Sequence, residues 1–161
     1  MGVFIPRSQE LRPTQDTPLI YLVGSLRNPQ VPVVAEQLRR QGFEVYDDWY
    51  AVGPEADDRW REYEQERGHR YREALKGWHA HHVFANDKFH LDKADGCVMV
   101  LPAGKSAHME FGYMVGQGKW GVILLEGEKP RWDIMYLFAA SVCDSLTHLL
   151  EVTESYLPVP F

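Results

Sequence analysis

The stretch DGCVMVLPAGKSAHMEFGYMVGQG, from Asp95 to Gly118, decides the fold. Within it, Gly96 to Leu101 is an apolar run of strand length, and a turn with Pro and Gly follows. A helix is predicted to begin near Ser106. In an open α/β sheet such a turn lies at the carboxyl end of a strand, where helix N-termini direct unpaired N–H groups into a crevice. We therefore predict a ligand site at this turn.

Glu110 is the acidic residue in the first turns of this predicted helix, and Ser106 is its predicted N-cap. A carboxylate in this position can act as a base, as a nucleophile or as a partner of the helix dipole. The alternative is an ordinary first-turn acid that the dipole favours. Nearby glycines favour the site, because they leave room for close approach to the backbone: Gly104, Gly112, Gly116 and Gly118.

Length and composition predict one compact domain. The chain has 161 residues, of which 45% are hydrophobic, and its formal net charge of -6 argues against nucleic acid as a partner. Apolar runs are of strand length and a signal peptide is not apparent, so we expect a soluble cytoplasmic protein without a membrane partner. Cys97 is predicted to pack in a buried strand, and a disulfide to Cys143 is not expected.

The pattern along the chain predicts an arm over residues 1–17 and a single α/β domain over 18–161. Helix-like spacing closed by Gly42 covers Val31 to Gln41. The predicted strands are Leu19 to Val23, Phe43 to Trp49, Gly96 to Leu101, Val122 to Leu125 and, more weakly, His148 to Val152. Helices between parallel strands indicate a doubly wound, Rossmann-like or flavodoxin-like sheet. We predict five parallel strands in the order 2-1-3-4-5.

Residues 53–90 form an insertion that a minimal α/β unit does not need, and we predict one or two helices there. Its aromatic residues favour a packing surface, with a lid or an oligomer contact as alternatives: Trp60, Tyr63, Tyr71 and Trp78. Its histidines lack the cysteine partners and the repeated spacing of a metal site, and no metal is predicted: His79, His81, His82 and His90.

Two further segments contain candidate site residues. The loop Gly24-Ser25-Leu26-Arg27-Asn28 follows the first strand, so its amides, hydroxyl and guanidinium group face the same crevice and suit a sugar or a phosphate. A plain surface turn is the alternative, because the glycine patterns of dinucleotide and P-loop sites are missing. In the second segment, Asn86-Asp87, we place Asp87 nearest the crevice. Asp95 is predicted to cap the start of its strand, and Asp92 to be solvated.

Together these motifs resemble the nucleoside 2-deoxyribosyltransferases and the related N-glycosidases of nucleoside 5′-monophosphates. The likeness covers about Pro18 to Met135 and is carried by Ile20-Tyr21-Leu22-Val23-Gly24, Asn86-Asp87 and Met109-Glu110-Phe111-Gly112-Tyr113. It implies that Glu110 is the nucleophile, that Asp87 assists proton transfer or orients the sugar, and that Tyr21 lies beside the nucleophile. It also implies a homodimer or higher oligomer with shared active sites, in which Asp133 and Met135 complete a neighbour's site.

The implied chemistry is cleavage of an N-glycosidic bond through a covalent glycosyl-glutamate, with transfer of the sugar to another base. No metal or organic cofactor is required. Gly104 stands where the transferases commonly have a sugar-binding aspartate. Ser25, Arg27, Lys105 and Ser106 suit a 5′-phosphate, as in the monophosphate hydrolases. Hydrolysis of a nucleotide therefore stays open, and so does a non-catalytic nucleotide-binding module.

Overall fold

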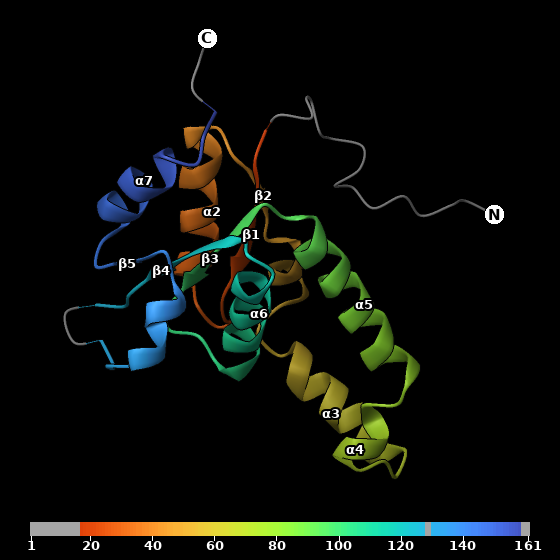
Figure 1. Ribbon diagram of the computed structural model, residues 1–161. Helices are drawn as coiled ribbons and strands as arrows, with labels where there is room; N and C mark the ends of the chain where they lie inside the picture. Colours follow the sequence, from red (N-terminus) through yellow and green to blue (C-terminus); the bar gives the residue numbers. More distant parts are fainter. Residues whose placement is uncertain (1–16, 128–129, 159–161) are drawn as a thin grey trace.

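A computed structural model describes residues 17–127 and 130–158 of this chain. Five parallel strands form its sheet in the order β2-β1-β3-β4-β5, which confirms the predicted topology and the doubly wound α/β class (Figure 1). The strands are β1 (Leu19–Val23), β2 (Glu44–Tyr46), β3 (Gly96–Val100), β4 (Trp120–Leu124) and β5 (Ser141–Cys143). Residues 1–16 of the predicted N-terminal arm lie outside the described residues.

The prediction of a strand over His148 to Val152 is wrong. This segment lies inside α7 (Leu146–Glu154), which begins after Ser145, whose Oγ accepts a hydrogen bond from the His148 N–H at 3.1 Å. Leu149 and Thr153 are buried and four residues apart, which is the spacing of one helix face. The fifth strand is the shorter segment Ser141–Cys143, which pairs with β4.

Alternating strand residues supply two hydrophobic layers. On one face, Ile20 and Leu22 of β1 pack with α2 (Gln30–Gln41) and α7. On the other face, Leu19, Tyr21 and Val23 pack with α5 (Trp78–Lys93) and α6 (Lys105–Gly116). The α2 helix ends as predicted at Gly42, whose φ of 116° suits glycine.

The insertion is helical and contains α3 (Ala56–Glu66), α4 (Tyr71–Ala74) and most of α5, one helix more than predicted, after a short 3-10 helix η1 (Asp48–Val52). In Figure 1, α3, α4 and the first part of α5 extend away from the sheet. The Trp60 ring packs 6.2 Å from the His79 ring. Trp78 and Tyr71 do not pack as predicted, because they are 94% and 69% exposed.

The amino ends of β3 and β4 meet at a ring stack. Gly96 pairs with Trp120, and a Cβ atom at Gly96 would lie 2.0 Å from the indole. The opposite side of the Trp120 ring stacks on Tyr156, with centroids 4.2 Å apart and planes 6° from parallel. Only glycine at position 96 therefore leaves room for this arrangement. Across the described ranges, none of the helices has the length and apolar character needed to cross a membrane.

Candidate active site

Glu110, Asp87 and Tyr21 come from three elements that meet on the α5 and α6 side of the sheet. Glu110 lies on α6 between Ala107 and Phe111, which are both buried against the strands, so it shares the inward face of the helix. Tyr21 is 1% exposed in the middle of β1, and Asp87 lies on α5. These three predicted residues are therefore brought together although 89 positions separate the first from the last.

Burial determines the ionisation of this group. It raises the pKa of Glu110 to about 7, and the nearby charge of Asp87 raises it further in the same direction. Burial also raises the pKa of Tyr21, with added contributions from Glu110 and Asp87. The pKa of Asp87 is raised by burial as well, and the Asn86 amide opposes that rise. Two carboxyl groups with raised pKa values share a partly dry site, which suits acid–base and nucleophilic chemistry.

Among the described residues, the Tyr21 hydroxyl makes no hydrogen bond to Glu110. Among the described residues Tyr21 interacts with Glu110 and Asp87 through charge alone. A neutral phenol beside two carboxyl groups can still donate a hydrogen bond to a ligand oxygen.

The sequence did not indicate that Tyr46 and His90 belong to this site. Tyr46 pairs with Tyr21 across the strands, and their rings lie 5.3 Å apart. The imidazole of His90 stacks on Tyr46 with centroids 3.7 Å apart. His90 follows Asn86 by four residues, so helical spacing alone could have joined these two, whereas Tyr46 needed the strand register.

The α6 helix begins one residue earlier than predicted. Gly104 is the N-cap and Lys105 the first helical residue, so Ser106 is not the cap. The Gly104 carbonyl oxygen accepts instead from the backbone N–H of His108 at 3.3 Å and faces the His108 Nδ1 at 2.7 Å. Lys105 and Ser106 are exposed at this helix start, and a Cβ at Gly104 would meet nothing within 4 Å. This end of α6 is open to a ligand.

The loop after β1 is more structural than predicted. Asn28 is 3% exposed, and its Nδ2 donates to the carbonyl oxygens of Val100 and Pro102 at 3.3 and 3.4 Å. It therefore ties the loop after β1 to the end of β3 and to the turn that follows β3. Ser25 Oγ accepts from the Arg27 N–H at 3.1 Å, and the Arg27 guanidinium pairs with Asp58 of α3 at 3.0 Å.

Gly24 of the same loop faces the sheet. A Cβ there would lie 2.9 Å from Val31 Cγ2, so glycine permits α2 to pack close to the end of β1. Its predicted contact with a substrate is not tested by this packing.

Asp133 immediately precedes the 3-10 helix η2 (Ile134–Phe138), and Met135 lies within it. Asp133 caps η2, because its carboxylate accepts from the Met135 N–H at 2.9 Å. His108, on α6, faces the hydroxyl of Tyr136 at 3.0 Å, and this contact fastens η2 to α6. The apolar side chains of this segment are nevertheless strongly exposed, with Trp132 at 93%, Ile134 at 80% and Leu137 at 85%.

The other predicted acids have structural partners. Asp95 Oδ2 accepts from the Leu19 N–H at 2.7 Å, so it caps β1 and not its own strand as predicted. Asp92 lies on the surface as predicted, but Lys88, Tyr113 and Gln117 hydrogen-bond to it. These contacts, with Lys88 the largest, lower its pKa to about 2. Neither residue joins the Glu110 group.

Within residues 17–127 and 130–158, the His, Cys, Asp and Glu side chains form no group of three or more that could hold a metal ion. Cys97 is buried, as predicted, and Cys143 is buried too; both are free cysteines. Cys97 lies on the Glu110 side of the sheet, and burial raises the pKa of its thiol to about 12. The thiol is therefore protonated and acts as a small packing group.

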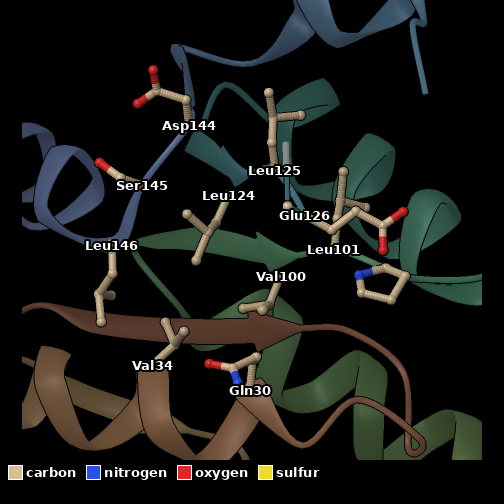
Figure 2. A pocket seen from close by; sticks show the side chains of 12 residues that line it. Gln30, Val34, Val100, Leu101, Leu124, Leu125, Glu126, Asp144, Ser145 and Leu146 are labelled. Carbon is tan, nitrogen blue, oxygen red and sulfur yellow. The ribbon is translucent and has the colours of Figure 1, made fainter. Parts of the chain in front are cut away.

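A cavity of about 380 Å³ lies on the opposite side of the sheet (Figure 2). Its walls are apolar side chains of α2, β3, β4 and α7, including Val34, Val100, Leu124 and Leu146. Glu126 and Asp144 lie at its rim. None of the residues of the Glu110 group lines it, so the cavity and the candidate active site are separate features.

No protein-family model and no curated protein matches this chain.

Proposed function

We propose that this protein cleaves the N-glycosidic bond of a (deoxy)nucleoside and transfers the sugar to another base. The observation that carries the proposal is the approach of Glu110, Asp87 and Tyr21 on one face of the sheet, with the pKa of Glu110 raised to about 7. These are the residues to which the family resemblance assigns the nucleophile, the acid and the neighbouring tyrosine.

In the first step the Glu110 carboxylate attacks C1′ of the sugar while the bond to the base breaks. The bonding pair leaves with the base, which takes up a proton from Asp87 or from a water that Asp87 holds. In the second step a nitrogen of another base attacks C1′, the bond to Glu110 breaks, and Asp87 recovers a proton. Inversion at each step retains the configuration at C1′.

Glu110 must be ionised to attack. Because the charge of Asp87 raises the pKa of Glu110, Asp87 ionises first, so of the two proton sources the water that Asp87 holds is the one present when Glu110 is ionised. Because Glu110 has a pKa of about 7 in the free protein, kcat/KM should rise as the pH passes upward through that value. Because the Glu110 and Asp87 carboxyl groups interact, the rising part of the pH–rate profile gives an apparent pKa of the pair and not of Glu110 alone.

Hydrolysis of a 5′-monophosphate is the second candidate, and exposed Lys105 and Ser106 at the start of α6 favour it. Arg27 argues for the uncharged nucleoside, because its guanidinium group already pairs with Asp58 and a phosphate would compete for it. A non-catalytic binding module would have no use for two buried carboxyl groups, which cost stability when they are ionised.

A second copy of the chain is part of the proposal. Trp132, Ile134 and Leu137 expose a continuous apolar segment, which is typical of a protein interface. If two copies meet there, Asp133 and Met135 of one lie at the edge available to the other. Sedimentation of the wild type and of Ile134→Asp tests this: a dimer that dissociates in the variant supports the shared site, and a monomeric wild type contradicts it.

Product analysis tests the reaction. The protein is incubated with 2′-deoxynucleosides and with their 5′-monophosphates, with and without a second free base, and products are identified by chromatography and mass spectrometry. A new nucleoside that forms only with the added base establishes the transferase, and free base with deoxyribose 5-phosphate establishes the hydrolase.

Glu110→Ala should abolish either product, and Glu151→Ala, an exposed acid on α7, is the matched control. Intact-mass analysis of protein quenched with substrate should reveal a sugar adduct that the Glu110→Ala protein lacks. Absence of turnover with all common bases, or full activity of Glu110→Ala, would sink the enzyme proposal and favour the binding module.

A further inference from the structure

Tyr46 occupies a fixed place beside the candidate active site. It is the last residue of β2, is 7% exposed, and pairs in parallel register with Tyr21. The two rings are tilted at 41° with centroids 5.3 Å apart. A side chain set by strand register and covered on both sides has little freedom to move.

His90 holds the other side of the Tyr46 ring. The imidazole lies 3.7 Å from the phenol ring between centroids, with planes only 13° apart. His90 is 3% exposed, and burial lowers its pKa, so the ring is neutral at physiological pH. This stack joins β2 to α5 one helical turn after Asp87.

The hydroxyl of Tyr46 reaches the same helix at a second point. Asn86 Nδ2 donates a hydrogen bond to Tyr46 Oη at 3.2 Å. The Asn86 amide also acts on the next residue, because it lowers the pKa of Asp87 against the effect of burial. A primary amide nitrogen has two N–H groups, so the one that does not serve Tyr46 is available to the carboxyl group of the neighbouring Asp87.

We propose that Tyr46 is a positioning residue for Asp87: its hydroxyl fixes the Asn86 amide, and that amide holds the Asp87 carboxyl group toward Glu110 and Tyr21. For its kinetic consequence this inference rests on the proposed function. Its structural part concerns the carboxyl group alone and needs no turnover.

The groups that face this cluster come from every element packed on it. Glu110 approaches from α6 and Tyr21 from β1, and both interact with Asp87. Asp87 itself, Asp48 of η1 and Asp47 act on Tyr46, and Asp48 and Lys93 act on His90. A change at Tyr46 alters none of these charges, so a shift in Asp87 would report the lost hydrogen bond.

The first test is a titration of carbon-13-labelled aspartate, followed by NMR, in which the Asp87 signal is assigned by its loss in Asp87→Asn. Tyr46→Phe keeps the stacked ring and removes only the hydroxyl group, which accepts the hydrogen bond from Asn86. The freed amide then turns away from Asp87, and the pKa of that carboxyl group should rise by about 0.5 to 1. Asn86→Ala, at an exposed helix position, should give the same rise. The double variant should add nothing, because both changes break one chain of contacts.

Tyr113→Phe is the matched control. It also loses a phenol hydroxyl, in this case one that donates to Asp92 on the surface, and it should leave Asp87 unchanged. An unchanged Asp87 titration in both Tyr46→Phe and Asn86→Ala, or effects of the two that add in the double variant, would overturn the inference.

Kinetics supply the second readout. Tyr46→Phe should lower kcat by about tenfold with little change in KM, since it misplaces a proton donor and leaves substrate binding intact. If the wild type shows no turnover, the proposed function fails, yet the titration still decides the role of Tyr46. If the wild type turns over and Tyr46→Phe has normal kcat and a normal Asp87 titration, the proposed function stands and the inference fails.

Discussion

Alternate residues of the same strands face two different layers. Toward α2 and α7, the buried side chains of β1, β3 and β4 are aliphatic, with the partly buried ring of Trp120 at the start of β4: Ile20, Leu22, Val98, Val100, Val122 and Leu124. Toward α5 and α6, β1 presents Tyr21 and β3 presents Cys97, and Glu110 and Asp87 lie above them. Both layers bury apolar surface, but the two carboxyl groups with raised pKa values lie on the second. The first face therefore contributes mainly to the stability of the fold. The second face gives up part of its own stabilisation, because it holds the carboxyl groups that the proposed chemistry needs.

Glu110→Gln gives the largest expected effect on activity. It also separates what Glu110 contributes to catalysis from what it costs in stability. Activity should fall by about 10³-fold or more, because an amide cannot form the glycosyl ester. The free energy of unfolding should instead increase at a pH where the wild-type carboxylate is charged. The folded-state pKa of Glu110 is raised from 4.5 to about 7, so its stabilising contribution is complete below 4.5 and is lost as the pH rises through about 7.

The Gln variant should therefore be more stable than the wild type at pH 8 by about 1 to 3 kcal/mol, and similar to it near pH 4.5. Urea denaturation at both pH values measures this. Equal stability at pH 8 would mean that the carboxylate is not desolvated, and would remove the contrast between the faces.

Leu22→Ala perturbs the opposite face. Leu22 is 0% exposed, and removing its side chain should lower the free energy of unfolding by about 3 kcal/mol. The protein that remains folded should keep its kcat, because no residue of the Glu110 group touches that layer. Denaturation and kinetics at low temperature measure the two quantities, and Val33→Ala, at a position 44% exposed, is the control. A large loss of kcat at full folding would show that the faces are coupled.

Gly121→Ala changes the shape of the Glu110 face without touching a charge. The new Cβ would lie 2.7 Å from Val115 Cγ1 and 2.8 Å from the Phe111 ring, so α6 must move away from β4. We expect a loss of about 2 kcal/mol in stability, together with a fall in activity. Gly112→Ala on the same helix meets nothing within 4 Å and should be neutral or slightly stabilising. If both variants behave alike, the close approach of α6 does not matter for the site.

Tyr21→Phe is the finest probe. The phenol hydroxyl makes no hydrogen bond to Glu110 in the described residues, so its removal should leave stability almost unchanged. We expect kcat to fall by about tenfold through loss of a donor near the reacting sugar. Normal kcat in steady-state assays would reduce Tyr21 to a packing residue.

Much of the fold could be predicted because its signals are local. The apolar runs of β1, β3 and β4 and the glycine after α2 need no knowledge of distant partners. In contrast, β5 has only the three residues Ser141–Cys143, and it is a strand because it pairs with β4, which a local pattern does not reveal. The helical spacing of Leu146, Leu149 and Leu150 after Ser145 was the local signal that the strand prediction overlooked.

The candidate site likewise contains some residues that local sequence signals predict and others that they do not. Glu110 and Asp87 could be chosen from motif spacing, and their approach in space agrees with that choice. The hydrogen bonds from Asn28 to the carbonyl groups of Val100 and Pro102 were not predicted, because they join segments 72 and 74 positions apart in the sequence. Tyr46 was missed because its neighbours depend on the register between β1 and β2. Long-range contacts of single side chains are the part that sequence periodicity does not encode.

The stack of Trp120 on Tyr156 gives the chain an internal optical signal. The two rings are nearly parallel at 4.2 Å, so their electronic transitions couple and should produce a distinct near-ultraviolet circular-dichroism band. Tyr156 follows the end of α7, whereas Trp120 begins β4. Undocking of the segment after α7 would erase the band while the secondary structure remains. A spectrometer can thus follow the α7 side of the sheet without a label, independently of the chemistry on the other side.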